Sequence, residues 1–143
     1  MKAWISLALC LVLLFSLVSC TEEDKGDAAH NASVQNKIET VINAILADDF
    51  QAAYALFSDI VKEEDFRAFF VNTRNYLKGV TAYELEQTEW KSDSFDGVET
   101  YTAVFKMTTN AQTYWVDAAE SSKWSGLVTF NIVSDAEREN QWS

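Results

Sequence analysis

The spacing of hydrophobic residues changes at Gly79 and divides the chain into two parts. Between residue 33 and this glycine, apolar residues recur every three or four positions, which is the period of helices that bury one side. After Gly79, apolar and polar residues alternate, and Thr, Val, Tyr, Phe and Trp become frequent, as in half-buried strands. This order predicts an α+β domain in which N-terminal helices pack on a sheet.

The first part divides into three predicted helices. Ser33 suits the N-cap of the first helix and Asp49 that of the second, because short polar side chains accept hydrogen bonds from free backbone amides. The acidic residues 63–65 suit the positive end of a third helix, which Gly79 ends as a left-handed cap. We expect the first two helices to pack as a hairpin. The apolar stripes are Val34, Ile38, Val41, Ile42, Ile45 and Leu46, then Phe50, Ala53, Tyr54 and Phe57, and finally Phe66, Phe69, Phe70, Tyr76 and Leu77.

The second part contains four predicted strands, at residues 81–91, 99–109, 112–120 and 124–134. The connections between them are short and rich in Ser, Asp, Asn and Gly, which are turn-forming residues. Connections of this length join antiparallel neighbours, so the prediction is a four-stranded meander. The last residues, 135–143, are polar and are expected to form a frayed tail.

Alternation assigns the side chains of the strands to two faces. The predicted core face consists of Tyr83, Leu85, Tyr101, Ala103, Phe105, Met107, Tyr114, Val116, Trp124, Val128, Phe130 and Ile132. On the other face, Trp90, Val104, Trp115 and Leu127 are more apolar than a solvated surface requires, which makes them a candidate interaction surface. Two alternatives stay open. Scattered apolar residues are normal on any surface, and a shift of one residue in register exchanges the faces.

The N-terminus has the pattern of a secretory signal. Lys2 precedes an apolar run of about 16 residues, which is shorter than the ~20 residues of a membrane-spanning helix. The run ends in Leu17-Val18-Ser19-Cys20, which resembles the lipobox of bacterial lipoproteins. The resemblance implies cleavage before Cys20 and lipidation of that cysteine. We therefore expect a signal peptide at residues 1–19, a flexible tether at 20–32, a folded domain at 33–134 and a polar tail at 135–143.

A lipidated Cys20 would attach the domain to a membrane of the cell envelope, because several acyl chains give durable binding. In Gram-negative lipoproteins an aspartate after the cysteine often marks retention in the inner membrane. Thr21 stands at that position here. If the host is Gram-negative, the outer membrane is therefore favoured.

Cleavage also changes the composition. Both cysteines, Cys10 and Cys20, would be lost to disulfide, thiol and metal chemistry, and the one histidine, His30, lies in the expected tether. The mature chain would therefore lack the residues needed for a serine triad, a Cys–His pair or a histidine-rich zinc site. We expect no metal or other cofactor. The mature chain would carry 10 basic and 22 acidic residues, a balance that repels nucleic acid.

Helices followed by a long antiparallel sheet resemble the cystatin-like cone of nuclear-transport-factor-two-like domains. The resemblance is carried by Phe66-Arg67-Ala68-Phe69-Phe70, by Arg74 and Gly79 at the end of the third helix, by Tyr101-Thr102-Ala103-Val104-Phe105, and by the late Trp124. It implies a curved sheet and a pocket between the sheet and the helices. The inward hydroxyls that would line this pocket are those of Tyr54, Tyr76, Tyr83, Tyr101 and Tyr114.

Three functions follow from these features. The leading hypothesis is a non-catalytic, membrane-tethered binding module for an envelope protein or a small apolar ligand. The alternative is a small isomerase- or dehydratase-like enzyme that uses a carboxylate and a tyrosine in the pocket. The third is a domain that forms homodimers through its sheet.

Overall fold

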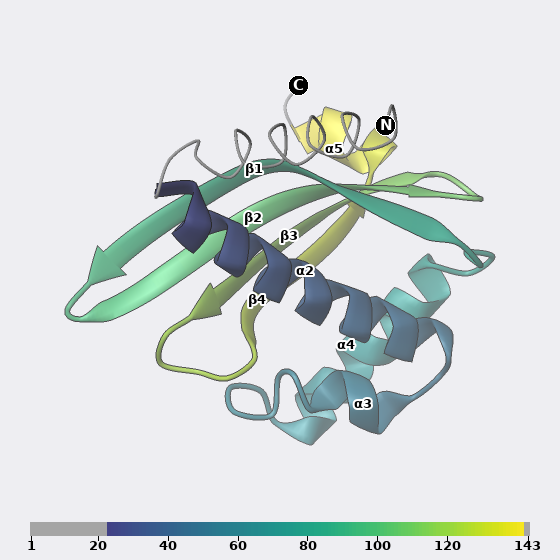
Figure 1. The fold of residues 1–143 in the computed structure, drawn as a ribbon. Helices are drawn as coiled ribbons and strands as arrows, with labels where there is room; N and C mark the ends of the chain where they lie inside the picture. Colours follow the sequence, from purple (N-terminus) through teal and green to yellow (C-terminus); the bar gives the residue numbers. More distant parts are fainter. Residues whose placement is uncertain (1–22, 142–143) are drawn as a thin grey trace, which may run out of the picture. The chain divides into compact units, whose positions relative to one another are not determined.

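The computed structural model describes residues 23–141, with side chains described from Ala28 onward. Within the described residues, 31–141 belong to one compact unit and 23–30 to another. The predicted signal peptide and the lipidation site Cys20 lie outside the described residues. The described chain has an α+β fold, as predicted, with helices followed by a curved four-stranded antiparallel sheet (Figure 1).

The helices are α2 (Glu23–Leu46), α3 (Phe50–Tyr54), α4 (Glu63–Tyr76) and α5 (Asp135–Gln141). Two predictions were wrong. Residues 23–32 are helical rather than a flexible tether. This segment has no apolar stripe that would predict a helix, but good helix formers such as Ala28 and Ala29 favour one. Residues 135–141 form α5 rather than a frayed tail, because Asp135 in the first turn and Arg138 in the last turn complement the helix dipole.

The predicted helix boundaries at Asp49 and Gly79 are confirmed, but the predicted N-cap at Ser33 was wrong, because α2 begins at Glu23 and Ser33 lies inside it. Asp48 takes a left-handed conformation (φ 58°), and the backbone N–H of Asp49 donates to the carbonyl of Ala44 at 2.8 Å, which ends α2. The Asp49 carboxylate accepts a hydrogen bond from the Ala52 N–H at 3.2 Å and caps α3. Gly79 has a φ of 90° just after α4. Local side-chain chemistry therefore fixes where the helices end.

The strands are β1 (Tyr83–Phe95), β2 (Val98–Thr109), β3 (Thr113–Ser121) and β4 (Leu127–Ser134), each antiparallel to the next in the order β1-β2-β3-β4. This is the predicted meander. However, β1 continues to Phe95, where a turn was expected. Only Asp96 and Gly97 form the turn, and their φ angles of 52° and 77° are those of the type I′ turn that suits a two-residue hairpin loop.

The core lies between the sheet and the helices. Within residues 31–141, Figure 1 shows α2, α3 and α4 on one side of the sheet, while α5 lies on the other side beyond the end of β4. The α2 stripe of Val34, Ile38, Val41, Ile42 and Ile45 is fully buried. From the sheet, the buried side chains facing it include Tyr101, Ala103, Phe105, Met107, Tyr114 and Val116. Most of the predicted core face is thus confirmed.

Two bulges correct the predicted faces. Thr88 is an extra residue in β1, so Trp90 pairs with Ala103 and stacks on Tyr101 (ring centroids 6.1 Å apart) on the core side rather than the outer face. A second bulge in β4 places Leu127 opposite Glu120, and Leu127 is fully buried rather than part of an outer surface. Trp124 lies in the connection before β4, is 37% exposed and therefore does not join the core.

Candidate functional site

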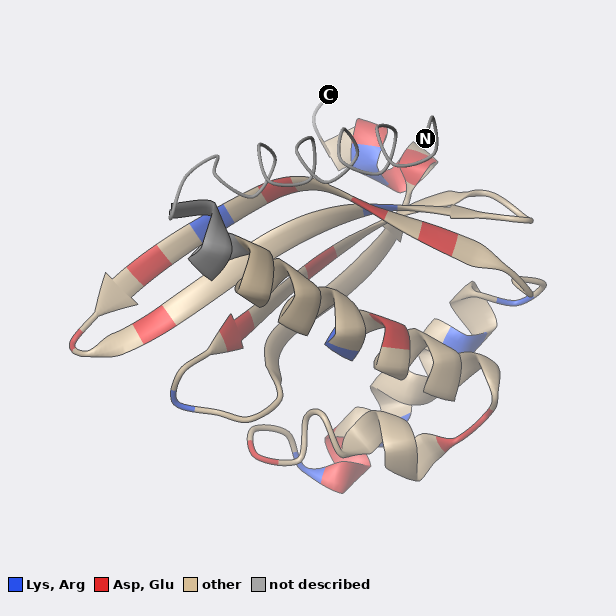
Figure 2. Cartoon of the chain, in the orientation of Figure 1, with Lys and Arg blue, Asp and Glu red and all other residues tan. Residues whose placement is uncertain are grey.

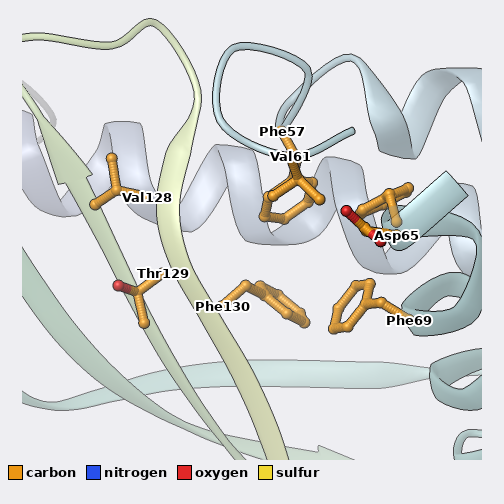
Figure 3. Close-up of a pocket in the computed structure, with 8 residues that line it drawn as sticks. Phe57, Val61, Asp65, Phe69, Val128, Thr129 and Phe130 are labelled. Atoms are coloured by element: carbon orange, nitrogen blue, oxygen red, sulfur yellow. The ribbon is translucent and has the colours of Figure 1, made fainter. Parts of the chain in front are cut away.

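An apolar groove lies between α4 and β4 and has a volume of about 320 Å³. Its lining residues come from the α3–α4 connection, α4 and β4, and Figure 3 shows them around the open space. We call this site the α4–β4 groove; it is lined by Phe57, Val61, Asp65, Phe66, Phe69, Val128, Thr129 and Phe130. The volume is at the lower end of the ~300–1,000 Å³ range in which proteins hold small ligands.

Aromatic contacts set the shape of this groove. Phe66 is 2% exposed and stacks on Phe57 with ring centroids 5.0 Å apart, so these two rings form a fixed floor. Phe69 and Phe130 are only partly buried and meet edge to face at 5.8 Å and 89°. One side of the groove therefore consists of ring surface that the protein itself does not cover completely.

A close backbone contact holds the start of β4 against the helical layer. The Leu127 N–H donates to the Leu56 carbonyl at 3.0 Å. A Cβ atom at the neighbouring Gly126 would lie 2.0 Å from the same carbonyl oxygen. Only glycine allows this approach, which brings β4 close enough to α4 to form the second wall of the groove.

Asp65 is the one charged residue among the eight that line the groove. It lies in the first turn of α4, and in Figure 3 its carboxylate is directed toward the space between Phe57 and Phe69. Within the described chain, none of the ion pairs involves Asp65. The site thus combines apolar walls with one acidic group.

A second hollow of about 250 Å³ continues along α4 and β4 and shares Phe69 with the groove. Its walls are more polar and include Asn72, Thr73 and Asn131. At its far end Glu137 of α5 accepts a hydrogen bond from the Tyr76 hydroxyl at 2.5 Å. The two hollows meet at Phe69, and polar side chains are more numerous among the residues that line the second.

The five tyrosines predicted to line one pocket are dispersed, and each hydroxyl bonds to the protein. Tyr54 donates to the Val61 carbonyl at 2.9 Å, and Tyr83 donates to Asn43 at 2.7 Å. Burial, reinforced by the charge of Glu39, raises the pKa of Tyr83 to about 12.

Only Tyr76 and Tyr114 among these tyrosines are in ring contact, with centroids 5.5 Å apart. The Tyr114 hydroxyl donates to the Tyr76 carbonyl at 3.2 Å. Burial and the hydrogen bond to Glu137 raise the pKa of Tyr76. These hydroxyls therefore support the fold at separate points.

The remaining tyrosine, Tyr101, belongs to a cluster of polar side chains beneath α2. Glu120 pairs with Tyr101 across β2 and β3, is 8% exposed and accepts hydrogen bonds from Lys37 at 2.7 Å and Ser33 at 2.8 Å. Gln87 donates to the Tyr101 hydroxyl at 3.2 Å and to Asn31 at 2.6 Å. We call this group the α2 polar cluster; it consists of Asn31, Ser33, Lys37, Gln87, Tyr101 and Glu120.

On the outer face, two of the four predicted interaction residues are found where expected. Val104 and Trp115 are partly buried there. The indole N–H of Trp115 donates to Asp135 at 2.7 Å, and the Arg138 guanidinium lies 3.8 Å from the ring centre, so α5 covers part of this face. Nearby, burial raises the pKa of Asp117, although Arg138 opposes the shift.

The sequence contained a signal for one overlooked residue. Glu120 follows Val116 and Ala118 in steps of two, so alternation alone predicts that it points inward. The place of Asp65 in the groove depends on the approach of β4, which no local pattern shows. Figure 2 shows acidic positions on both the helices and the strands, so charge alone did not distinguish Asp65 from the other acidic residues.

Comparison of the chain with protein-family models, curated proteins and solved structures gave no match. Among the helices of residues 23–141, none is long and apolar enough to cross a membrane. The same residues contain no group of three or more His, Cys, Asp or Glu side chains suited to a metal ion.

Proposed function

We propose that this protein is a lipid-anchored binding module of the cell envelope that holds a small apolar ligand in the α4–β4 groove without transforming it. The observation that carries the proposal is the incompletely covered ring surface of Phe69 and Phe130 beside a hollow of about 320 Å³. Burying such aromatic surface under a ligand is favourable by roughly 25 cal/mol per Å² of apolar area. The resemblance to nuclear-transport-factor-two-like domains, which bind ligands between helices and sheet, is consistent with this role.

The neutral dye N-phenyl-1-naphthylamine tests the groove, because its fluorescence rises in an apolar site. We expect the protein without its signal segment to bind the dye in a saturable manner. Val128→Trp would fill the groove and is expected to weaken binding at least tenfold. Val71→Trp is the matched control, because Val71 lies on α4, is 38% exposed and does not line the groove. Absent binding, or equal binding by both variants, would contradict the proposal.

The anchor is tested separately at Cys20. In a bacterial host, the full chain should incorporate radiolabelled palmitate and fractionate with membranes, with the outer membrane if the host is Gram-negative. Cys20→Ala should abolish both. A Cys20→Ala variant that is labelled and fractionates like the parent would remove the envelope assignment.

One observation favours the enzymatic alternative. Glu120 and Tyr101 face each other across neighbouring strands on the core side, which supplies a carboxylate and a tyrosine side by side. Lys37 and Ser33 already engage that carboxylate, so the resting arrangement favours a structural role. An isomerase would accelerate hydrogen–deuterium exchange beside the carbonyl of added ketones in D₂O, and Glu120→Gln would abolish this effect. Exchange at the buffer rate would exclude this alternative for the ketones tested.

A further inference from the structure

The acidic residue in the α4–β4 groove points to the chemical class of the ligand. Asp65 stands among lining residues that are otherwise apolar or, in the case of Thr129, neutral. Asp65 is exposed, so a ligand that filled the groove would meet this carboxylate at the solvent-facing edge of the site. A cationic group on the ligand would be attracted to the carboxylate there, whereas a neutral group would not be and an anionic group would be repelled.

The basic residues nearest to Asp65 in the sequence are Lys62 and Arg67, and neither lines the groove. Arg67 binds Glu63 at 3.0 Å and lies over the ring of Phe50, 4.3 Å from its centre. Lys62 and Arg67 line a different hollow, together with Glu63 and Glu64. Neither basic residue lines the groove itself, so its charge is supplied by Asp65 alone among the lining residues.

We infer that the α4–β4 groove binds a small cationic amphiphile, with its apolar chain or ring against Phe69 and Phe130 and its ammonium group on Asp65. This inference rests on the proposed binding function and adds the charge of the ligand. The position of Asp65 in the groove lets the head and the tail of one molecule be held at once. The acidic balance of the chain, with 22 acidic and 11 basic residues, favours the approach of a cation.

Competition against the neutral dye provides the test, with three ligands of equal chain length, each below its micelle concentration: decylammonium, decanol and decanoate. At about 0.15 M salt, where distant charges are screened over ~8 Å, decylammonium should displace the dye at a concentration at least fivefold lower than decanol. Decanoate should be the weakest. In Asp65→Asn the preference of decylammonium over decanol, both measured against the dye affinity of that variant, should fall to less than twofold.

Glu64→Gln is the matched control, because it removes the same charge from the same exposed turn but does not line the groove. It should keep the preference for decylammonium. If the dye and decanol fail to bind, the groove function itself is overturned. If both bind but decylammonium has no advantage, or Glu64→Gln loses the preference as fully as Asp65→Asn, only the assignment of a cationic ligand to Asp65 is overturned.

Discussion

The α4–β4 groove and the α2 polar cluster lie on the same side of the sheet and differ in how their polar groups are satisfied. In the cluster, Glu120 is bonded by Lys37 and Ser33, and Gln87 bonds to Tyr101 and Asn31. In the groove, ring surface is partly open, and the carboxylate of Asp65 takes no part in the ion pairs of the described residues. A partly buried network whose side chains bond to one another stabilises one structure, whereas an open hollow with an acid at its wall can accept a ligand.

The largest effect is expected from a change that moves β4 away from the helices, because the groove depends on their close approach. Gly126→Ala should lower the free energy of unfolding by about 3 kcal/mol or more, because its Cβ would lie 2.0 Å from the Leu56 carbonyl oxygen. Urea unfolding followed by tryptophan fluorescence measures the effect.

Gly97→Ala is the control for the loss of glycine itself. Gly97 has a φ of 77° with open space around its missing Cβ, so we expect a cost of only about 1 kcal/mol. Equal losses in the two variants would show that the approach of β4 to Leu56 is not what makes Gly126 necessary.

The polar cluster should respond to the loss of a single partner. Glu120→Ala is expected to destabilise the fold by about 2 kcal/mol, because it leaves the Lys37 ammonium, whose side chain is 20% exposed, without its carboxylate. In a double-mutant cycle, Lys37→Met with Glu120→Leu should cost less than the two single changes added together. Additive losses would mean that the two side chains stabilise the fold independently.

The groove wall should contribute less to stability than to binding. Phe69→Ala should cost about 1 kcal/mol, because the ring is only partly buried, and it should weaken dye binding at least fivefold. Val71→Ala, an exposed change on the same helix, should alter both by little. A loss of several kcal/mol in Phe69→Ala would identify this ring as core and remove it from the ligand surface.

The smallest effect concerns Tyr83, which donates to Asn43 of α2. Burial raises its pKa to about 12, so the folded state holds the phenolic proton more tightly than the unfolded chain. The resulting stabilisation is present below pH ~10 and is lost as the pH rises toward 12. Absorbance at 295 nm, compared between the parent and Tyr83→Phe, should show one late-ionising tyrosine that the variant lacks.

A change at Glu39 distinguishes the two causes of this pKa shift. Glu39→Gln should lower the pKa of Tyr83 only in part, since burial is the larger cause. A full return to an ordinary tyrosine pKa would assign the shift to charge instead.

The fold could be predicted largely from the sequence because its signals are local. Asp49 and Gly79 mark helix ends through their own side-chain or backbone preferences, and alternation gave four strands and most of the core face. The faces were wrong at Trp90 and Leu127, because a bulge adds one residue without a clear compositional mark.

The candidate site was less predictable, because it is tertiary. The tyrosines were predicted from alternation, but their hydroxyl partners, such as Asn43 for Tyr83, come from elements far along the chain. Asp65 was predicted only as a residue suited to a helix dipole. Its role as a groove residue depends on Val128 and Phe130 of β4, which follow it by more than sixty positions.

The extra residue Thr88 has an evolutionary consequence. Deleting that one position would leave Gln87 opposite Phe105 and Trp90 opposite Ala103, so the ladder would become regular and the indole of Trp90 would stay on the core side. A bulge in an edge strand can therefore absorb the loss of one residue without moving a displayed aromatic group. Descendants of a common ancestor could in this way differ in length by one residue and still present the same surfaces.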